Sequence, residues 1–427
     1  MTLDTIVAPA TPVGRSALAI VRIDGPRSAE ILLTLAGVVP QPRVATLTHI
    51  HTLDECIATR YVAPHSFTGN DLVELTLHGS PVIVERVIRA AVGLGARMAE
   101  PGEFTERAVL NGKIDLVQAE SIADLINSRT ALQAKLSLGN LQGALSRKAV
   151  TIRESLLFVI SRLEAALDFS EEGYEFIGPD ESRERVLNAI RDTRSLAETY
   201  RRGHATTAGL TAVILGRPNA GKSTLLNRLV GSDRAIVTPI PGTTRDIVRE
   251  TIDIGGLPVT IADTAGLRAS DDMVESIGVG RARDAARTAD IVLYLVDATV
   301  GLTSDDEVDA YPDALLVYTK TDLAPAPPNA LAIHEHAIDD VLARLDELVR
   351  ENFAAPEGSL VNERQRQAVA ECESALQVAL TSIDDRHEEQ VVLVDLYRAS
   401  TALGLLTGAI TREDVFEEIF SKFCIGK

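Results

Sequence analysis

The chain has 427 residues, enough for two or three domains that each bury a core. Its formal net charge is −19, which argues against broad nonspecific binding to nucleic acid, because affinity for phosphate backbones comes from clustered Lys and Arg. Any RNA that the protein serves is therefore expected to be held mainly by a partner or by a local patch.

Cysteine usage and hydropathy indicate the compartment. The three cysteines, Cys56, Cys372 and Cys424, are far apart and odd in number, so they form neither a disulfide framework nor a metal spacing. No run of about eighteen apolar residues predicts a membrane span, and the N-terminus lacks the basic start and apolar core of a signal peptide. We expect a cytoplasmic protein.

Hydrophobic periodicity divides the chain into four segments. Residues 1–115 have strand-like patterns at 17–23 and 72–77 and helical spacing at 82–92, which predicts a mixed α/β domain. Residues 116–205 carry apolar side chains every three or four positions, and the pattern returns in residues 355–427, so both are expected to form one helical domain. Residues 206–354 are then an inserted domain, which ends before the Pro-Glu-Gly linker that follows it.

The inserted segment contains a complete phosphate-binding loop. Residues 216–223 read Gly-Arg-Pro-Asn-Ala-Gly-Lys-Ser, between an apolar strand at 211–215 and a helix at 223–230. The glycines let backbone N–H groups surround phosphates at a helix N-terminus, Lys222 reaches the β- and γ-phosphates, and the Ser223 hydroxyl is placed to bind Mg²⁺. Strand, loop and helix in register predict a Ras-like P-loop domain that binds a nucleotide.

Two further segments follow in the order that a GTPase requires. Residues 241–246, Pro-Gly-Thr-Thr-Arg-Asp, offer two threonines, one of which can close on Mg²⁺ when the γ-phosphate is present. Asp263 ends a second apolar strand and can hold the water shell of Mg²⁺, while the Gly266 N–H meets the γ-phosphate. Leu267 stands where Ras-like proteins have the glutamine that positions water, so hydrolysis needs another group, and Glu275 is the candidate.

The choice of base depends on residues 319–322, Thr-Lys-Thr-Asp, which follow a strand at 314–318. The Asp322 carboxylate can accept from N1–H and the 2-amino group of guanine, whereas adenine presents an acceptor at N1 and would leave the charge unpaired, so GTP is favoured over ATP. Thr319 replaces the usual Asn and is expected to support the loop more weakly. The last guanine-contacting loop is shortened, and residues 332–337 stand in its place.

Motifs from one end of the chain to the other resemble a single family. They are Asp-Thr-Ile-Val-Ala at 4–8 with Gly-Arg at 14–15, Ser-Phe-Thr-Gly at 66–69, His-Gly at 78–79, Pro-Gly-Glu-Phe-Thr-Glu-Arg-Ala at 101–108, the P-loop, Gly-Thr-Thr-Arg-Asp at 242–246 and Cys-Ile-Gly-Lys at 424–427. Together they resemble the MnmE (TrmE) tRNA-modification GTPases. The switch motif and the C-terminal motif are specific to that family when one chain has both, whereas the P-loop is shared with its whole class.

The resemblance implies an N-terminal domain that binds 5-formyltetrahydrofolate or a related folate and forms a homodimer, with folate contacts at Arg22, Glu74, Lys113 and Lys427. It also implies an FAD-dependent partner, MnmG (GidA), in a heterotetramer. With this partner the family adds an aminomethyl or carboxymethylaminomethyl group to carbon 5 of the wobble uridine of certain tRNAs. Cys424 matches a cysteine that is proposed to take part in the modification.

For the inserted domain, the resemblance implies a K⁺ ion in place of an arginine finger. Asn219 matches its P-loop ligand, Glu275 matches the residue that orients the water, and the rest of the K⁺ shell matches Thr238, Ile240 and Thr243. Motifs and resemblance together predict Mg²⁺ on Ser223 and Thr244 and a GTP site made of Asn219, Ala220, Gly221, Lys222, Ser223, Thr224, Thr238, Thr243, Thr244, Asp263, Thr264, Ala265, Gly266, Thr319, Lys320 and Asp322.

Two other functions compete with a K⁺-activated GTPase that acts in wobble-uridine modification. A ribosome-assembly or stress-signalling GTPase would bind RNA through a basic appended module, for which the sequence gives no pattern. A scaffold that uses GTP only to stay ordered, without hydrolysing it, is compatible with Leu267. The acidic balance and the C-terminal motif favour the first function over the ribosome-assembly alternative.

Overall fold

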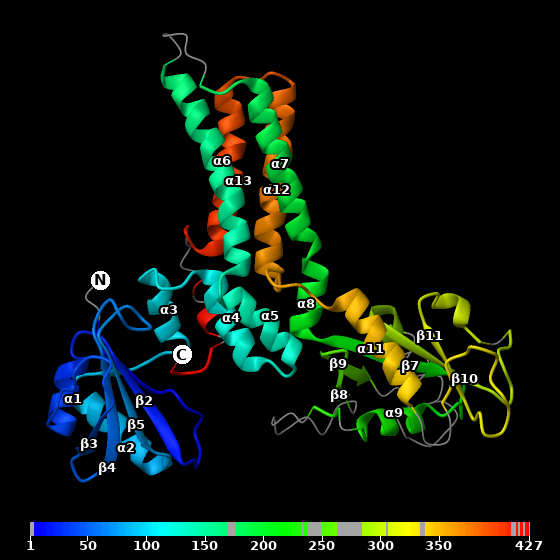
Figure 1. The fold of residues 1–427 in the computed structure, drawn as a ribbon, viewed down its shortest axis with the longest axis horizontal. Coiled ribbons are helices and arrows are strands. Elements are labelled where there is room, and N and C mark those ends of the chain that lie inside the picture. The colour runs from blue at the N-terminus through cyan, green and yellow to red at the C-terminus, as the bar shows by residue number, and fades with distance from the viewer. Residues whose placement is uncertain are drawn as a thin grey trace.

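The structure, a computed structural model, describes residues 4–169, 176–232, 234–236, 249–262, 284–304, 306–333, 338–410, 416, 419–421 and 423–426. A helical domain stands upright in the centre of Figure 1, with the α/β domain of the N-terminus on one side of its base and a second α/β domain on the other. The chain enters the helical domain both before and after the second α/β domain, which is therefore an insertion. No helix of the described residues is long and apolar enough to cross a lipid bilayer.

The N-terminal domain is built on a six-stranded sheet of order β3-β4-β5-β2-β1-β6, in which the β1–β6 pair is parallel and the other pairs are antiparallel. One face packs on α1 and α2 through a cluster that includes Val21, Ile31 and Val87, while Phe104 of α3 covers part of the other face. The predicted strands and helix are confirmed. The elements are β1 (Ile6–Pro9), β2 (Leu18–Asp24), α1 (Ser28–Ala36), β3 (Thr46–Ile50), β4 (Asp54–Tyr61), β5 (Leu72–His78), α2 (Pro81–Gly93), β6 (Arg97–Met98) and α3 (Glu103–Leu110).

The helical domain is a bundle of four long helices, α6, α7, α12 and α13, above the shorter α4 and α5 (Figure 1). Its core joins residues from both ends of the chain, such as Leu156 and Ile160 of α6 with Leu376 of α12 and Leu396 of α13. The helical periodicity predicted in both segments is thus confirmed. The helices are α4 (Leu116–Asn127), α5 (Ala131–Leu141), α6 (Ala144–Asp168), α7 (Pro179–Glu198), α8 (Tyr200–Ala208), α12 (Glu363–Asp384) and α13 (Glu389–Thr407).

The inserted domain has a five-stranded sheet of order β11-β10-β7-β9-β8, parallel except for the β8–β9 hairpin. Apolar side chains of α9 and α11, such as Leu225 and Leu345, pack on strand residues such as Ile214. The parallel order brings the carboxyl ends of β7, β10 and β11 to one edge, where doubly wound sheets bind ligands. The elements are β7 (Leu210–Gly216), α9 (Lys222–Val230), β8 (Arg249–Ile254), β9 (Leu257–Ala262), β10 (Ile291–Asp297), η2 (Val308–Ala310), β11 (Leu315–Thr319) and α11 (Asp339–Phe353).

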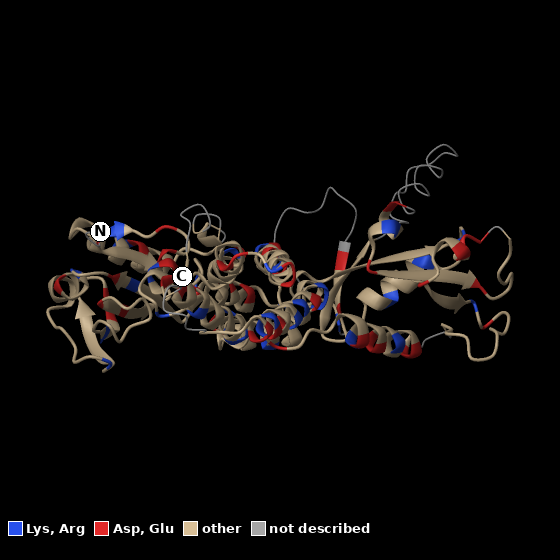
Figure 2. Cartoon of the chain, turned by 90° about the horizontal axis from the view of Figure 1, so that it is seen from above, with Lys and Arg blue, Asp and Glu red and all other residues tan. Residues whose placement is uncertain are grey.

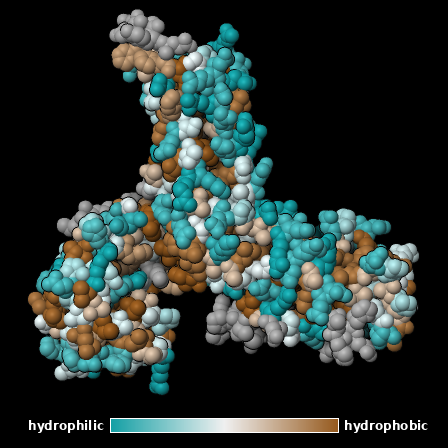
Figure 3. Space-filling view, viewed as in Figure 1, coloured by the Kyte–Doolittle hydropathy of each residue, from teal (hydrophilic) through white to brown (hydrophobic). Residues whose placement is uncertain are grey.

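The two chain crossings between the helical and inserted domains run side by side. The Thr206 hydroxyl donates to the Phe353 carbonyl over 3.1 Å and accepts from the Ala355 N–H over 3.2 Å. A Cβ on Gly203 would lie 2.0 Å from the Leu360 carbonyl oxygen, so α8 passes too close for any side chain. These contacts hold the two crossings against each other. Figure 3 shows hydrophobic residues at the centre of the base of the bundle.

Candidate functional sites

The phosphate-binding loop joins the end of β7 to the start of α9. Gly216, Asn219 and Gly221 have positive φ angles of 136°, 60° and 90°. A Cβ on Gly216 would lie 2.5 Å from the carbonyl oxygen of Leu295, so the neighbouring strand leaves room only for glycine. Because α9 begins at Lys222, the N–H groups of its first turn and its dipole face the loop, which is the arrangement that binds phosphate.

The Lys222 ammonium is hydrogen-bonded to the backbone of this loop. Its Nζ donates to the carbonyl oxygens of Gly216 and Arg217 over 2.8 and 2.7 Å. Burial lowers the pKa of Lys222. Ser223 and Thr224 follow in the first turn of α9 and are exposed, so their hydroxyls are accessible to a metal or a phosphate. The predicted group from Asn219 to Thr224 therefore lies on one loop and one helix end.

Thr319 connects the guanine-selecting segment to the P-loop. It ends β11, is 5% exposed, and its hydroxyl donates to the Ala220 carbonyl over 2.8 Å. A hydroxyl has one hydrogen to donate, whereas the amide of the usual asparagine has two. The substitution therefore keeps a direct bond to the loop, and weaker support of the loop stays a prediction.

Lys320 and Asp322 differ in their surroundings. Lys320 has a positive φ of 55°, and its Nζ lies 2.5 Å from Oδ2 of Asp297 at the end of β10. Burial raises the pKa of Asp297, but hydrogen bonds from Lys320 and Thr299 outweigh burial and hold that pKa below its usual value. Asp322 is exposed, so its carboxylate is accessible to a base at this edge of the sheet.

Residues 331–333, which include the start of the segment predicted to replace the last guanine loop, pair beside β11. The Tyr318 N–H donates to the Leu331 carbonyl and the Ile333 N–H to the Tyr318 carbonyl, each over 2.8 Å. The Thr321 hydroxyl donates to the Ile333 carbonyl over 2.7 Å. Residues 331–333 thus lie beside the end of β11, and residues 334–337 lie outside the described part of the chain.

Other predicted site residues also lie outside the described ranges, and their roles stay predictions. They are Thr238, Ile240, Thr243, Thr244, Asp263, Thr264, Ala265, Gly266, Leu267, Glu275 and Lys427.

A second polar group lies on the N-terminal sheet, on the face opposite α1 and α2. Arg22 of β2 and Glu74 of β5 are partners across the strands, with Nε and Oε1 2.8 Å apart and side chains 19% and 22% exposed. The Tyr61 hydroxyl donates to Glu74 over 3.3 Å, and burial together with Glu74 raises the pKa of Tyr61. The Arg22 guanidinium also lies 6.0 Å from the ring centre of Phe67.

Lys113 reaches the same neighbourhood from the end of the domain. Its Nζ donates to the Pro64 carbonyl over 2.9 Å, and its Cγ would lie 3.3 Å from a Cβ on Gly69. The loop at 64–69 therefore contacts Lys113 directly and Arg22 through Phe67. Three of the four residues predicted to contact folate are brought to one region.

The C-terminal segment docks on this domain. Ile425 forms an antiparallel bridge with Pro101, and the Gly426 carbonyl accepts from Nη1 of Arg22 over 3.3 Å. Gly426 has a φ of 93°, and a Cβ there would lie 2.0 Å from the Pro9 carbonyl oxygen. Cys424 is exposed. The docking places the residue before Lys427 beside the Arg22–Glu74 pair.

A buried ionic network, which the sequence did not predict, joins the end of β2 to the loop at 68–70 and to α3. The fully buried Asp24 carboxylate accepts from Thr68, from Asn70 over 3.0 Å and from Arg107 over 3.0 Å. Burial raises the pKa of Asp24, and these three donors oppose that rise. Arg107 also contacts Glu103 over 2.9 Å. The sequence signal was a lone Asp at the end of an apolar strand, which by itself has many explanations.

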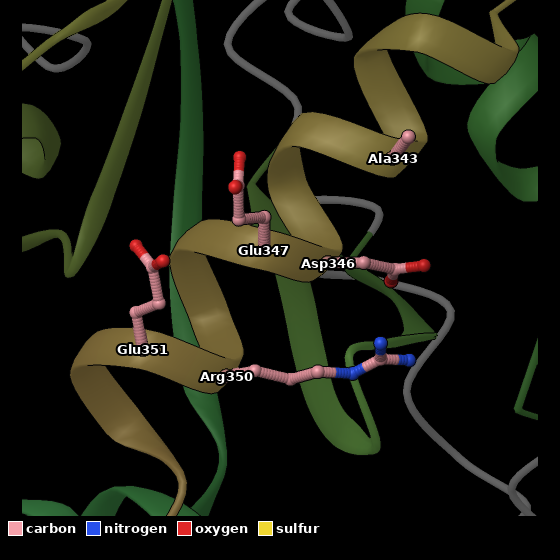
Figure 4. Close-up of a pocket in the computed structure, with 5 residues that line it drawn as sticks. All are labelled: Ala343, Asp346, Glu347, Arg350 and Glu351. Carbon is pink, nitrogen blue, oxygen red and sulfur yellow. The ribbon is translucent and has the colours of Figure 1, made fainter.

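A shallow pocket on α11 lies apart from the P-loop. Figure 4 shows Glu347 and Glu351 on one side of the helix and Asp346 and Arg350 on the other. The Asp346 carboxylate accepts from Nη1 of Arg234 over 2.7 Å and from the Gly255 N–H over 2.6 Å, so it fastens the β8–β9 turn. The pocket is lined by Ala343, Asp346, Glu347, Arg350 and Glu351.

The fold and the loop geometry define a P-loop GTPase domain inserted into a helical domain, preceded by a separate α/β domain. Comparison with known family models agrees with the N-terminal and helical domains. The model of the GTP-binding protein TrmE N-terminus matches residues 5–113, and the model of the MnmE helical domain matches residues 116–424. The solved structure of Aquifex aeolicus Era is 26% identical over 40% of this chain and 67% of that chain, with a TM-score of 0.25.

Full-length relatives give the family. The tRNA modification GTPase MnmE of Koribacter versatilis is 40% identical, and the alignment covers 99% of each chain. The MnmE of Legionella pneumophila strain Paris is 39% identical, and the alignment covers 100% of each chain. The chain belongs to the tRNA modification GTPase MnmE family and is a GTP hydrolase.

Proposed function

We propose that this GTPase is activated by K⁺ and that, with an FAD-dependent partner of the MnmG type, it modifies carbon 5 of the wobble uridine of certain tRNAs with a one-carbon unit from a folate. The proposed folate site is supported by the docking of the C-terminal segment. The Gly426 carbonyl of this segment accepts from Arg22, which pairs with Glu74. A guanidinium, a carboxylate and an aromatic ring are thus combined at one place.

These groups suit the chemistry of a reduced folate. A pteridine presents an array of donors and acceptors that a carboxylate such as Glu74 can pair with, and a flat ring can stack on Phe67 or on the guanidinium of Arg22. The glutamate tail of a folate carries carboxylates, for which Lys113 and Lys427 are the cationic partners. In this proposal the folate supplies the one-carbon unit, and the protein binds and orients it.

The nucleotide part of the proposal assigns separate roles to the P-loop residues. Lys222 binds the β- and γ-phosphates, Ser223 and Thr244 hold Mg²⁺, and Asp322 selects guanine. K⁺ would supply positive charge to the phosphates in place of an arginine finger, with Asn219 as its P-loop ligand. Asn219 lies in the P-loop between the end of β7 and the start of α9, with a left-handed φ of 60°.

The open part of the N-terminal sheet supports a homodimer. Leu47 of β3 and Ile57 of β4 are partners across the strands and are 66% and 41% exposed. Ile57 is also the register partner of Thr76, two residues from Glu74, so this apolar face is continuous with the proposed folate site. Burial of such a face against a second copy would remove apolar surface from water.

Charge supports a shared tRNA site. Lys and Arg are interspersed with Asp and Glu along the helices of Figure 2 rather than gathered by sign. With a net charge of −19, strong binding of a phosphate backbone by this chain alone is not favoured. We infer that tRNA is held largely with the partner protein.

The proposal is tested with the purified full-length chain. Isothermal titration with 5-formyltetrahydrofolate is expected to show binding that Arg22→Gln weakens by at least roughly tenfold, as expected for loss of a charged hydrogen-bond donor. Arg89→Gln is the matched control, since Arg89 is 78% exposed on α2 and pairs with Glu85 of the same helix. The wobble uridine is then analysed by mass spectrometry after incubation with the partner, tRNA and GTP. Equal folate binding by both variants would refute the assignment of the site.

A further inference from the structure

Asp306, in the loop that follows β10, is a buried carboxylate to which no motif assigns a role. Its side chain is 4% exposed, and it accepts from the Thr303 N–H over 2.9 Å, the Thr303 hydroxyl over 3.2 Å and the Tyr294 hydroxyl over 3.2 Å. Nε of Arg217 lies 3.2 Å from the same carboxylate. Burial raises the pKa of Asp306, but these donors and the charge of Arg217 outweigh burial and keep the group ionised.

Arg217 is the second residue of the P-loop and is anchored in two directions. Its carbonyl accepts from Nζ of Lys222 over 2.7 Å and from the Ala220 N–H over 3.2 Å, inside the loop. Its guanidinium points out of the loop and donates to Asp306 and to the Thr303 hydroxyl. The P-loop is thus tied to the loop between β10 and β11 through one side chain.

The bond between the Arg217 guanidinium and Asp306 matters most when a phosphate is present. The P-loop lysine of this class directs its ammonium to the β- and γ-phosphates, which compete with the carbonyls of Gly216 and Arg217 for its three hydrogens. When Lys222 gives up its hydrogen bond to the Arg217 carbonyl, Arg217 is held less firmly inside the loop. The bond between Arg217 and Asp306 does not involve the phosphate-binding groups, so it remains.

The position of Arg217 in turn limits where Asn219 can lie. Only Pro218 separates them, and its ring fixes φ near −65°. Asn219 itself has a left-handed φ of 60°, which asparagine adopts more readily than most non-glycine residues, so the backbone on both sides of Pro218 is restricted.

We propose that Asp306 is a positioning residue for GTP hydrolysis, which acts through Arg217 to hold the P-loop, and with it Asn219, in register with the nucleotide. The expected effect on KM for GTP requires only that the chain is a GTPase. The effect on the cation rests on the proposed K⁺ site at Asn219.

Four variants of the full-length chain test this role: Asp306→Asn, Arg217→Gln, the double variant, and the control Asp309→Asn, which removes a charge from an exposed position of η2 in the same loop. For each we would measure KM and kcat for GTP, the K⁺ concentration that gives half-maximal activation, and the unfolding temperature. The first two variants are expected to raise KM and the half-activating K⁺ concentration by roughly tenfold, the size of one charged hydrogen bond.

The double variant should be no worse than the more affected single variant in KM, because either change already breaks the contact between Arg217 and Asp306. Arg217→Lys should recover part of the loss, since it restores a cation without the forked geometry. The control should stay within about twofold of the wild type, as surface substitutions usually do.

Two outcomes would overturn the proposal. In one, Asp306→Asn and Arg217→Gln lower the unfolding temperature but leave KM, kcat and the K⁺ response unchanged, so the cluster only stabilises the fold. In the other, their effects on KM add in the double variant, so the residues do not act through each other. Should Asp306→Asn fail to fold, Arg217→Gln decides alone, since its side chain is 32% exposed. Absence of K⁺ stimulation in the wild type would refute the proposed K⁺ site, while the KM values still decide the role of Asp306.

Discussion

The substitution Gly426→Ala tests whether docking of the C-terminal segment builds the proposed folate site. An L-residue at a φ of 93° costs about 1–2 kcal/mol. The new Cβ would also lie 2.0 Å from the Pro9 carbonyl oxygen, and no side-chain rotation relieves a contact with backbone. The segment must lift, and Arg22 then loses its bond to the Gly426 carbonyl. Together these effects weaken docking by about 2–4 kcal/mol, which is roughly 30-fold to several hundred-fold in the docked population.

Two assays on the full-length chain measure this loss. Folate affinity, from calorimetric titration, should fall at least about tenfold, and carboxypeptidase should release the last residues faster. Gly37→Ala is the matched control, because Gly37 also has a positive φ, of 69°, but nothing lies within 4 Å of an added Cβ. GTP hydrolysis should be unchanged in both variants. Equal folate affinity and equal release rates in the two variants would show that docking of the C-terminal segment does not build the folate site.

Three further predictions concern the G domain and the helical frame. Thr319→Val leaves the buried Ala220 carbonyl without the hydroxyl that donates to it over 2.8 Å. GDP binding, measured with a fluorescent nucleotide, should weaken by roughly tenfold. Unchanged affinity would show that the bond does not shape the loop. Burial, and then the charge of Glu120, raises the pKa of Asp124 to about 7, so its stabilising effect is complete below its unfolded pKa and is lost as pH rises through about 7. Asp124→Asn should therefore raise the unfolding temperature more at pH 8 than at pH 5, and an equal shift at both would contradict this cause. Asp346→Ala removes the acceptor of the β8–β9 turn and should cost roughly 2–3 kcal/mol in urea unfolding, which a loss under about 0.5 kcal/mol would contradict.

Local patterns were sufficient to predict much of the fold. The strand, loop and helix around residues 216–223 follow from sequence alone because glycine positions, apolar runs and the helix start are all short-range signals. The helical stripes before and after the inserted domain were equally clear, since they repeat over many turns.

Long-range contacts could not be predicted in this way. The bonds of Asp24 to Thr68 and Arg107, and of Arg22 to Gly426, join residues that are distant in sequence, and nothing local specifies such partners. The same holds for the bond between Arg217 and Asp306, which depends on how two loops at one sheet edge face each other. Resemblance to a family pointed to Arg22 as a functional residue, but only the structure brings the C-terminal segment to it.

The most direct test of K⁺ activation is GTP hydrolysis by the purified chain in K⁺ and in Na⁺ at equal ionic strength, with Asn219→Ala measured alongside. We predict that K⁺ stimulates hydrolysis selectively and that the stimulation vanishes in the variant while the variant still binds nucleotide. Equal rates in the two cations would contradict a K⁺ ion in the role of an arginine finger.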